Sequence, residues 1–338
     1  MKSESGCLDE RFSTTRLLFR SRTDSGDGQQ HGEVESQSRA SYNKREGGLR
    51  TKGFVKKDLP NKPIITVVTV VFNGAQYLEN TIRSVLHQNY DNVEYIVIDG
   101  GSTDGTMKII HKYAEAINYW LSEGDEGIYD AMNKGIAAAS GAWLNFMNAG
   151  DTFCSTVSVA DTVNEFSEAM VYYSDTILYL KDGDNDYYRK LTCDAQRYEF
   201  IHQSCIYSRQ LHGSHGMYIA APGVTVSDYL FFRSVPREHW KKTETTISRY
   251  LVGNNISSGR RHDEQVFGVD LLFGARSITR TFVGYWVRII QVILHGIAKS
   301  VLARGLYLEL VEKYSKGPRK EFDSAVWMTP EMKKEPHE

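Results

Sequence analysis

The hydrophobic positions of this chain alternate between short β-branched runs and helical repeats from residue 64 onward. Residues 64–71 form a continuous β-branched run, which is typical of a buried strand in a parallel sheet. In residues 75–87 the apolar side chains recur near one face of a helix. The alternation then continues through strands expected at 93–98, 118–122 and 142–147 and helices expected at 103–114 and 127–140.

Strands and helices that alternate at this spacing imply right-handed crossovers and a mainly parallel sheet. The pattern changes after Asp151. Residues 158–166 are expected to be helical, and the segments 170–177, 176–181 and 187–191 are expected to be short strands of a meander or an edge addition. The fold class predicted from this pattern is α/β.

The two ends of the chain differ from this middle part. Residues 1–59 are polar and show no helical or strand period, which predicts a disordered leader. Residues 275–308 contain five Arg or Lys and no Asp or Glu, among many apolar and aromatic residues. Such a segment, placed here at 276–316, favours peripheral contact with an anionic membrane surface. The alternative is a C-terminal helix packed on the domain, followed by a loose tail at 317–338.

Composition narrows the class of protein. The 338 residues carry a formal net charge of -2, which gives no sign of a nucleic-acid partner. Four cysteines lack the paired spacing of a zinc or redox site and favour a reducing, cytoplasmic compartment. Residues 1–7 include an acid, Glu4, where a signal peptide needs an apolar run. No uncharged apolar run approaches the ~20 residues that span a bilayer.

Carboxylates and glycines collect where the predicted strands end. Asp99 follows the second strand, and Asp151 follows the fourth. Open α/β sheets bind ligands at this carboxyl edge. Each residue also has a structural alternative, because Asp99 can end a strand, Asp104 and Asp151 can cap helices, and Lys134 can be a solvated helix residue. Taken together they predict a binding site, and we interpret it as a nucleotide-sugar site.

Four motifs in order resemble the family 2 glycosyltransferases, which are inverting enzymes with the GT-A fold. They are Val70-Val71-Phe72-Asn73, Ile98-Asp99-Gly100-Gly101-Ser102-Thr103-Asp104-Gly105-Thr106, Ser122-Glu123 to Lys134, and Asn148-Ala149-Gly150-Asp151. The branch they resemble builds colanic acid and related exopolysaccharides or capsules. The resemblance spans 64–153. It implies a GT-A fold with a mainly parallel central sheet flanked by helices, and we expect a C-terminal helical extension.

The resemblance assigns donor contacts to seven residues, which are Phe72, Asn73, Asp99, Asp104, Asp130, Asn133 and Lys134. Asp151 matches the last acid of the family's metal-binding Asp-x-Asp type motif. Asn148 stands where that motif has its earlier acid, and Gly150 replaces another acid. An amide oxygen can ligate a metal but adds no charge. We therefore expect Mg²⁺ or Mn²⁺ at Asp151 and Asn148, arriving mainly with the nucleotide.

The second half matches fewer motifs. His202-Gln203 and Ser227-Asp228-Tyr229 resemble a His-Gln and a Ser-Asp-Tyr motif of the similar exopolysaccharide enzymes. Asp228 is the predicted general base, with a helix N-cap as its alternative. His202 and Gln203 are expected on the acceptor or diphosphate side, although His202 can equally be a structural histidine. Arg260 and Arg261 are candidates for diphosphate contact, or else belong to a solvated basic turn.

These residues predict an inverting glycosyltransferase that moves a sugar from a nucleoside-diphosphate donor to a hydroxyl of a growing, lipid-linked glycan. The predicted domain spans 60–275, with a donor half at 60–153 and an acceptor half at 154–275. One rival is a nucleotidyltransferase, although no lysine-bearing Gly-rich loop follows the first strand. The other rival is a non-catalytic binding partner of another transferase, which Asn148 and Gly150 keep open.

Overall fold

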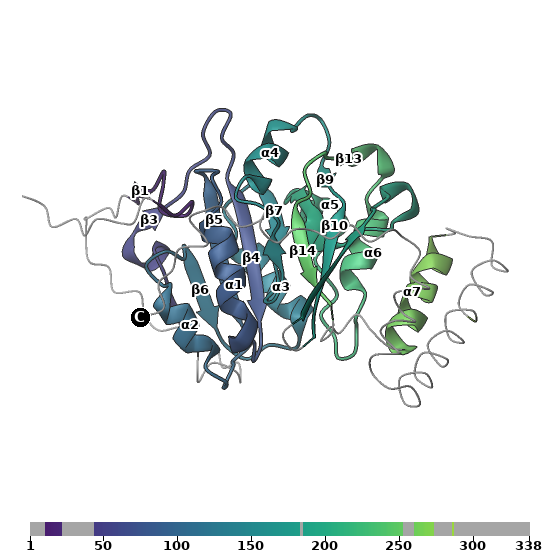
Figure 1. The fold of residues 1–338 in the computed structure, drawn as a ribbon, viewed down its shortest axis with the longest axis horizontal. Helices are drawn as coiled ribbons and strands as arrows, with labels where there is room; N and C mark the ends of the chain where they lie inside the picture. Colours follow the sequence, from purple (N-terminus) through teal and green to yellow (C-terminus); the bar gives the residue numbers. More distant parts are fainter. Residues whose placement is uncertain (1–10, 22–43, 183–184, 253–259, 274–285, 287–338) are drawn as a thin grey trace, which may run out of the picture.

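A large mixed sheet forms the centre of the protein. The computed structural model describes residues 11–21, 44–182, 185–252, 260–273 and 286. Within these ranges eight strands join in the order β13-β9-β12-β7-β4-β5-β6-β2 (Figure 1). Their bounds are β2 (Arg45–Gly47), β4 (Ile65–Val71), β5 (Val93–Asp99), β6 (Tyr119–Ser122), β7 (Trp143–Phe146), β9 (Val171–Tyr173), β12 (Cys205–Ser208) and β13 (Trp240–Lys242).

The parallel core of this sheet is the block β7-β4-β5-β6, as the sequence pattern predicts. The strands outside the block change direction. β12 pairs antiparallel with both β7 and β9, and β2 pairs antiparallel with β6. The α/β class is confirmed, and the sheet is mixed rather than mainly parallel at its edges.

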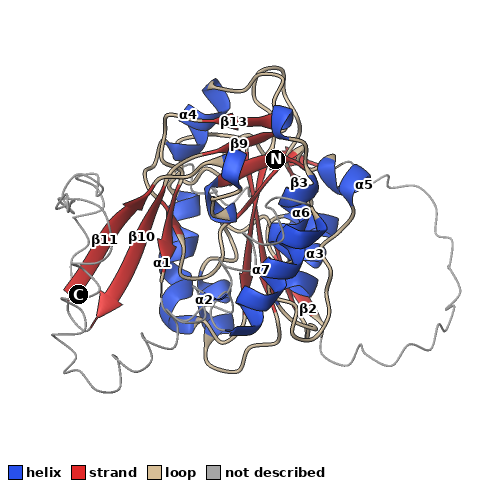
Figure 2. Cartoon of the chain, turned by 90° about the vertical axis from the view of Figure 1, so that its right-hand side faces the viewer, coloured by secondary structure: helices blue, strands red, loops and turns tan. Residues whose placement is uncertain are grey.

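Helices cover both faces of the sheet (Figure 2). The helices α1 (Ala75–Leu86), α2 (Thr106–Lys112) and α4 (Ser158–Asn164) pack on one face. The helices α3 (Ile128–Ala138) and α6 (Ser227–Ser234) pack on the other face. Helix α3 packs directly against β4 at Gly135. A side chain there has no room, since an added Cβ atom would stand 2.5 Å from Val68 Cγ1. The buried β-branched residues of β4 thus separate two apolar layers.

A second sheet of the described chain, in the order β11-β10-β14-β8, lies beside the first. The hairpin β10 (Thr176–Asp182) and β11 (Asn185–Leu191) extends from the body in Figure 2. Two of the three strands expected here thus pair with each other, whereas the first, β9, joins the large sheet between β13 and β12. β14 (Ser248–Leu251) pairs with β8 (Thr152–Phe153) in register Arg249↔Thr152. This pairing brings the end of β14 beside Asp151. A short helix α5 (Leu211–His215) lies between β12 and α6 in the chain.

The prediction that residues 1–59 form a disordered leader is wrong for 11–21 and 44–59. These segments contain β1 (Phe19–Arg20), η1 (Arg50–Lys52) and β3 (Phe54–Val55), besides β2. Leu49 is fully buried, and the Lys56 ammonium donates to the carbonyls of Ser13 and Asp91. The ordering comes from long-range pairing and single buried side chains, which leave no periodic signal in the sequence.

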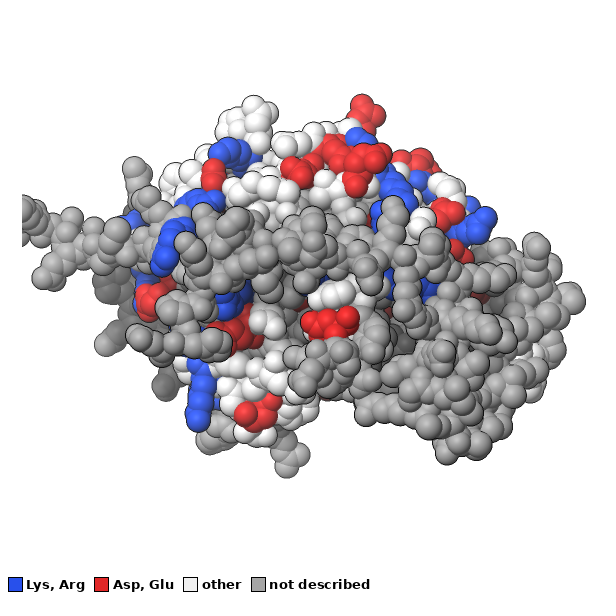
Figure 3. All heavy atoms as spheres, in the orientation of Figure 1, with Lys and Arg blue, Asp and Glu red and all other residues white. Residues whose placement is uncertain are grey.

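The described surface mixes both signs of charge, as Figure 3 shows for one face. Among the described residues no helix is both long and apolar enough to cross a bilayer. The segments predicted as membrane-associated at 276–316 and loose at 317–338 lie outside the described residues, apart from Trp286.

Stability is expected to fall as the pH is lowered from about 6.5 to about 4, partly because of His212 in α5. Its ring forms hydrogen bonds with Tyr207 Oη and Gly216 O and stacks on Phe231. Burial lowers the pKa of His212 to about 4. Between about pH 6.5 and about pH 4, the unfolded chain therefore binds a proton at His212 that the folded chain does not bind. Urea unfolding of His212→Phe should show a smaller stability loss between pH 7.5 and 5 than the native protein, and an equal loss would contradict this account.

Candidate active site

A cleft of about 920 Å³ opens at the carboxyl ends of β4 and β7. Its walls also include the start of α3, the segment 197–203, α6 and α7 (Arg260–Leu272). The cleft therefore lies where the sequence analysis placed a ligand, at the carboxyl edge of the sheet. Seven of the predicted site residues line it, namely Phe72, Asn73, Asn148, Asp151, His202, Gln203 and Asp228.

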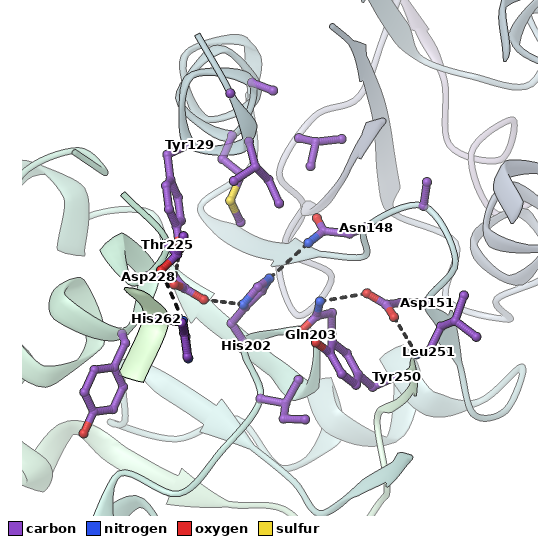
Figure 4. A pocket seen from close by; sticks show the side chains of 18 of the residues that line it. Tyr129, Asn148, Asp151, His202, Gln203, Thr225, Asp228, Tyr250, Leu251 and His262 are labelled. Carbon is purple, nitrogen blue, oxygen red and sulfur yellow. Dashed lines mark hydrogen bonds and ion pairs between the residues drawn. The ribbon is translucent and has the colours of Figure 1, made fainter. Parts of the chain in front are cut away.

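Asp228 lies at the centre of a hydrogen-bond chain inside this cleft (Figure 4). The Tyr129 hydroxyl donates to Asp228 Oδ1 over 2.6 Å, and His202 Nδ1 lies 2.7 Å from Asp228 Oδ2. The opposite ring nitrogen, His202 Nε2, lies 3.4 Å from Asn148 Nδ2. Residues from α3, η3 (His202–Ser204), α6 and the end of β7 thus meet at one point.

Asp228 is not a helix cap, which was its structural alternative. Val226 occupies the N-cap position of α6, and Asp228 lies in the first helical turn with its carboxylate turned to His202 and Tyr129. Burial raises the pKa of Asp228, but the hydrogen bonds from His202 and Tyr129 outweigh it. The pKa ends below its ordinary value, so Asp228 is ionised at neutral pH.

Asp151 is held on the other side of the cleft. Gln203 Nε2 donates to its Oδ2 over 2.7 Å, and the Leu251 backbone N–H donates to its Oδ1 over 2.8 Å. Burial raises the pKa of Asp151 to about 7. Among the described residues no group of three or more His, Cys, Asp or Glu is arranged to hold a metal ion. Asp151 alone fits a site in which one carboxylate and the substrate phosphates share a divalent ion.

Phe72 and Asn73 form the part of the cleft next to β4. The Phe72 side chain is 65 % exposed, which is unusual for a large apolar residue beside a buried strand. Asn73 has a φ of 49°, a left-handed conformation that asparagine adopts more readily than most residues. Its Oδ1 accepts from the Thr103 N–H over 2.9 Å. The strand-to-helix turn thereby fixes an aromatic ring at the mouth of the cleft.

Asp99 and Asp104 lie outside the lining of this cleft. Asp99 is fully buried and accepts from Ser122 Oγ at 2.7 Å and the Ser102 N–H at 3.1 Å. Asp104 accepts from the N–H groups of Ala75 and Thr106 at 3.0 Å. Hydrogen bonding from Thr106 lowers the pKa of Asp104. Asp104 thus joins the starts of α1 and α2, although the N-cap position of α2 is Gly105, and Asp99 shapes the loop beside Asn73.

The three candidates on α3 also make structural contacts rather than line the cleft. Lys134 Nζ pairs with Glu123 at 3.0 Å and with Asp130 at 3.1 Å. Asn133 Nδ2 donates to Tyr218 O, and Asn133 Oδ1 accepts from the Tyr218 N–H. Asn133 therefore holds the segment before α6, and the charge of Lys134 is balanced by two carboxylates. The donor contacts expected of these residues stay a prediction.

The predicted basic pair falls at the start of α7. Arg261 is exposed and packs against Gly223, where a Cβ atom would stand 2.4 Å from its Nη1. It does not line the cleft, whereas its neighbour His262 does. The side chain of Arg260 and the segment 253–259 lie outside the described residues.

Tyr129 and Asp125 are lining residues that the sequence analysis did not single out. Both lie within the motif from Ser122 to Lys134, so the sequence analysis identified their segment but gave these two residues no role. Burial raises the pKa of Asp125. Tyr250 lines the cleft from β14. Its place there depends on the pairing of β14 with β8, which the sequence does not predict.

Comparisons with known proteins agree with this fold. An uncharacterized glycosyltransferase of Mycobacterium tuberculosis is 41% identical over 110 residues, covering 32% of this chain and 42% of that protein. A PGL/p-HBAD biosynthesis glycosyltransferase of the same species is 30% identical over 166 residues, covering 46% of this chain and 63% of that protein. The chain thus spans less than two thirds of the length of these relatives.

Among solved structures, the mannosyltransferase PcManGT from Pyrobaculum calidifontis, in complex with GDP-Man and Mn²⁺, resembles this one with a TM-score of 0.51. The likeness is one of fold, at 14% identity over 75% of this chain and 79% of that chain. The predicted GT-A fold, with a mixed central sheet flanked by helices, is confirmed. Residues 66–221 match the family model for glycosyl transferase family 2.

Proposed function

We propose that this protein is an inverting glycosyltransferase that moves a sugar from a nucleoside-diphosphate donor to a hydroxyl of a growing glycan. The observation that carries this proposal is the hydrogen-bond chain from Tyr129 through Asp228 to His202 in the cleft. Direct displacement at an anomeric carbon needs a group that removes a proton from the attacking hydroxyl. The match of residues 66–221 to the family 2 model supports a sugar-nucleotide donor.

The donor is proposed to lie against Phe72 and Asn73. The exposed ring of Phe72 can stack against a nucleobase. Asn73 lines the same wall of the cleft, with polar groups in its backbone and side chain. Asp99 acts indirectly, because it holds the Ser102 N–H while Ser102 Oγ accepts from the Asn73 N–H over 2.7 Å. The diphosphate would then extend toward Asp151.

Asp151 is the residue proposed to share Mg²⁺ or Mn²⁺ with the donor diphosphate. A bound divalent ion would offset the charge that develops on the leaving diphosphate. Gln203 and the Leu251 N–H orient the Asp151 carboxylate by one hydrogen bond to each oxygen, and the residue lines the cleft. Asn148 stays in this proposed set, because its amide nitrogen is directed to His202 and its Oδ1 has no hydrogen-bond partner among the described residues.

A donor panel tests this function. Thermal unfolding is measured with UDP-, GDP- and dTDP-sugars, with and without Mn²⁺, and release of the nucleoside diphosphate is followed in parallel. A donor that binds the folded state raises the stability by RT ln(1 + [L]/Kd). Phe72→Ala should lose this shift, whereas Met217→Ala, which is also exposed but outside the cleft, should keep it. If no donor is bound or consumed, the proposal fails.

A second candidate function is that of a non-catalytic binder of nucleotide or glycan. The observation that favours it is the lone carboxylate Asp151, with the neutral Asn148 in the position of a second acid. The same panel separates the two functions. A binder would be stabilised by a donor without releasing nucleoside diphosphate, even when acceptor glycans and Mn²⁺ are supplied.

The acceptor is proposed to be lipid-linked and to be met at the cytoplasmic face of a membrane. This rests on the basic and aromatic composition of 276–316 and on the exposed Leu272 and Phe273 at the end of α7, which lead into it. Deletion from residue 282 onward should then reduce sedimentation with anionic vesicles. Unchanged sedimentation and unchanged transfer to lipid-linked acceptor would refute the membrane contact.

A further inference from the structure

The two oxygens of the Asp228 carboxylate are both engaged by the protein. Tyr129 Oη donates to Oδ1 over 2.6 Å, and His202 Nδ1 lies 2.7 Å from Oδ2. Burial holds the pKa of Tyr129 well above its usual range, so its hydroxyl stays protonated and remains a donor. Two short hydrogen bonds thus hold the Asp228 carboxylate in place between Tyr129 and His202.

The tautomer of His202 follows from the same contacts. An ionised carboxylate can only accept hydrogen bonds, so His202 Nδ1 must carry the proton that it directs to Asp228. In a neutral imidazole the other nitrogen, Nε2, is then an acceptor. Asp228 therefore fixes both the orientation of the ring and the position of its free lone pair.

The contact at His202 Nε2 is weaker than the hydrogen bonds at the Asp228 carboxylate. Its neighbour is Asn148 Nδ2 at 3.4 Å, which is long for a hydrogen bond. Both side chains line the cleft, and Figure 4 shows the His202 ring between Asp228 and Asn148. A hydroxyl that approaches Nε2 at ordinary hydrogen-bond distance can replace this weak contact.

We infer that His202 Nε2 accepts the proton of the acceptor hydroxyl, and that Asp228 is a positioning residue that holds His202 in the required tautomer. The inference rests on the proposed transferase function. In the step the hydroxyl proton moves to Nε2 and the oxygen forms a bond to the anomeric carbon. The bond from that carbon to the diphosphate breaks, and its electron pair leaves with the nucleoside diphosphate. The imidazolium then faces the Asp228 carboxylate and later returns the proton to water.

Two substitutions of His202 test this assignment. His202→Ala removes the ring, whereas His202→Asn retains a donor near the Nδ1 position for Asp228 and removes only Nε2. The assay is release of nucleoside diphosphate from UDP-GlcNAc or GDP-mannose, whichever the donor panel identifies, with water as the acceptor. Both variants are expected to lose at least about a hundredfold in kcat with the donor KM unchanged. The matched control is His111→Ala, an exposed histidine on α2 outside the cleft, which should turn over normally.

Recovery of turnover on adding imidazole distinguishes a histidine that accepts a proton from a histidine with a structural role alone. It should restore turnover to His202→Ala, where the ring has left a space beside Asp228, and should not restore it to the double variant His202→Ala/Asp228→Asn. Turnover of both His202 variants within about tenfold of the native protein would overturn the inference and leave Asp228 as the direct base. Absence of imidazole rescue would also overturn it. If the native protein itself consumes no donor, the proposed function fails instead.

Discussion

Replacing Asp228 with asparagine is expected to lower turnover by about 10²- to 10⁴-fold while donor binding is retained. The amide keeps the shape of the carboxylate but directs an N–H toward His202 Nδ1. The imidazole proton would then move to Nε2, which is the wrong tautomer for accepting a proton; a comparable Asp-to-Asn exchange in the serine protease triad costs about 10⁴ in kcat. Steady-state release of nucleoside diphosphate and thermal shift with the donor measure the two effects separately.

Asp194→Asn is the matched control for this experiment. Asp194 caps the short helix η2 (Ala195–Arg197) through a hydrogen bond from the Gln196 N–H and does not line the cleft. Its exchange should leave turnover unchanged. Turnover of Asp228→Asn close to the native rate would show that the hydrogen-bond chain to His202 has no part in the reaction.

Removal of the Glu94 carboxylate is expected to cost about 3–5 kcal/mol of unfolding free energy, as breaking one side of a buried ion pair does. Glu94 is 2 % exposed and pairs with Arg50 at 2.6 Å. It also accepts from the Thr66 hydroxyl and from the backbone and hydroxyl of Ser140. Glu94→Ala would leave the buried Thr66 hydroxyl and the partly exposed Arg50 guanidinium without this acceptor. Urea unfolding of the variant measures the loss.

Glu115→Ala provides the comparison for Glu94→Ala. Glu115 also pairs with a basic residue, Lys52, but its side chain is 71 % exposed. Exposed pairs of this kind contribute about 0–1 kcal/mol. Equal losses in the two variants would mean that the burial of Glu94 has no bearing on stability.

The order of strands and helices between residues 64 and 166, apart from the two-residue strand β8, could be predicted because each of these elements carries its own period. The β-branched run of β4 and the apolar face of α1 are local signals, and their bounds fall within a few residues of those predicted. The antiparallel additions β12 and β2 were not predictable in the same way. Their directions depend on which strand they meet, and that is a property of the whole fold.

The site shows the same division between local and long-range information. Asp228 and His202 were each singled out by a motif, but only the fold shows that their side chains meet at 2.7 Å. Asn133 and Lys134 also lie in a motif, yet their polar atoms are engaged by Tyr218 and by Glu123 and Asp130. A motif marks residues that belong near a site. It does not separate those that face the ligand from those that support the wall behind them.

The edge of the large sheet has a practical consequence for handling the protein. β2 pairs with β6 along Arg45↔Ser122, Glu46↔Leu121 and Gly47↔Trp120, so a polar segment without a periodic pattern covers the backbone of the last parallel strand. A shortened chain that begins at residue 60 would expose that strand, and open strand edges pair readily with other chains. Such a chain should form aggregates during expression, and retaining residues from 44 onward should keep the protein monodisperse.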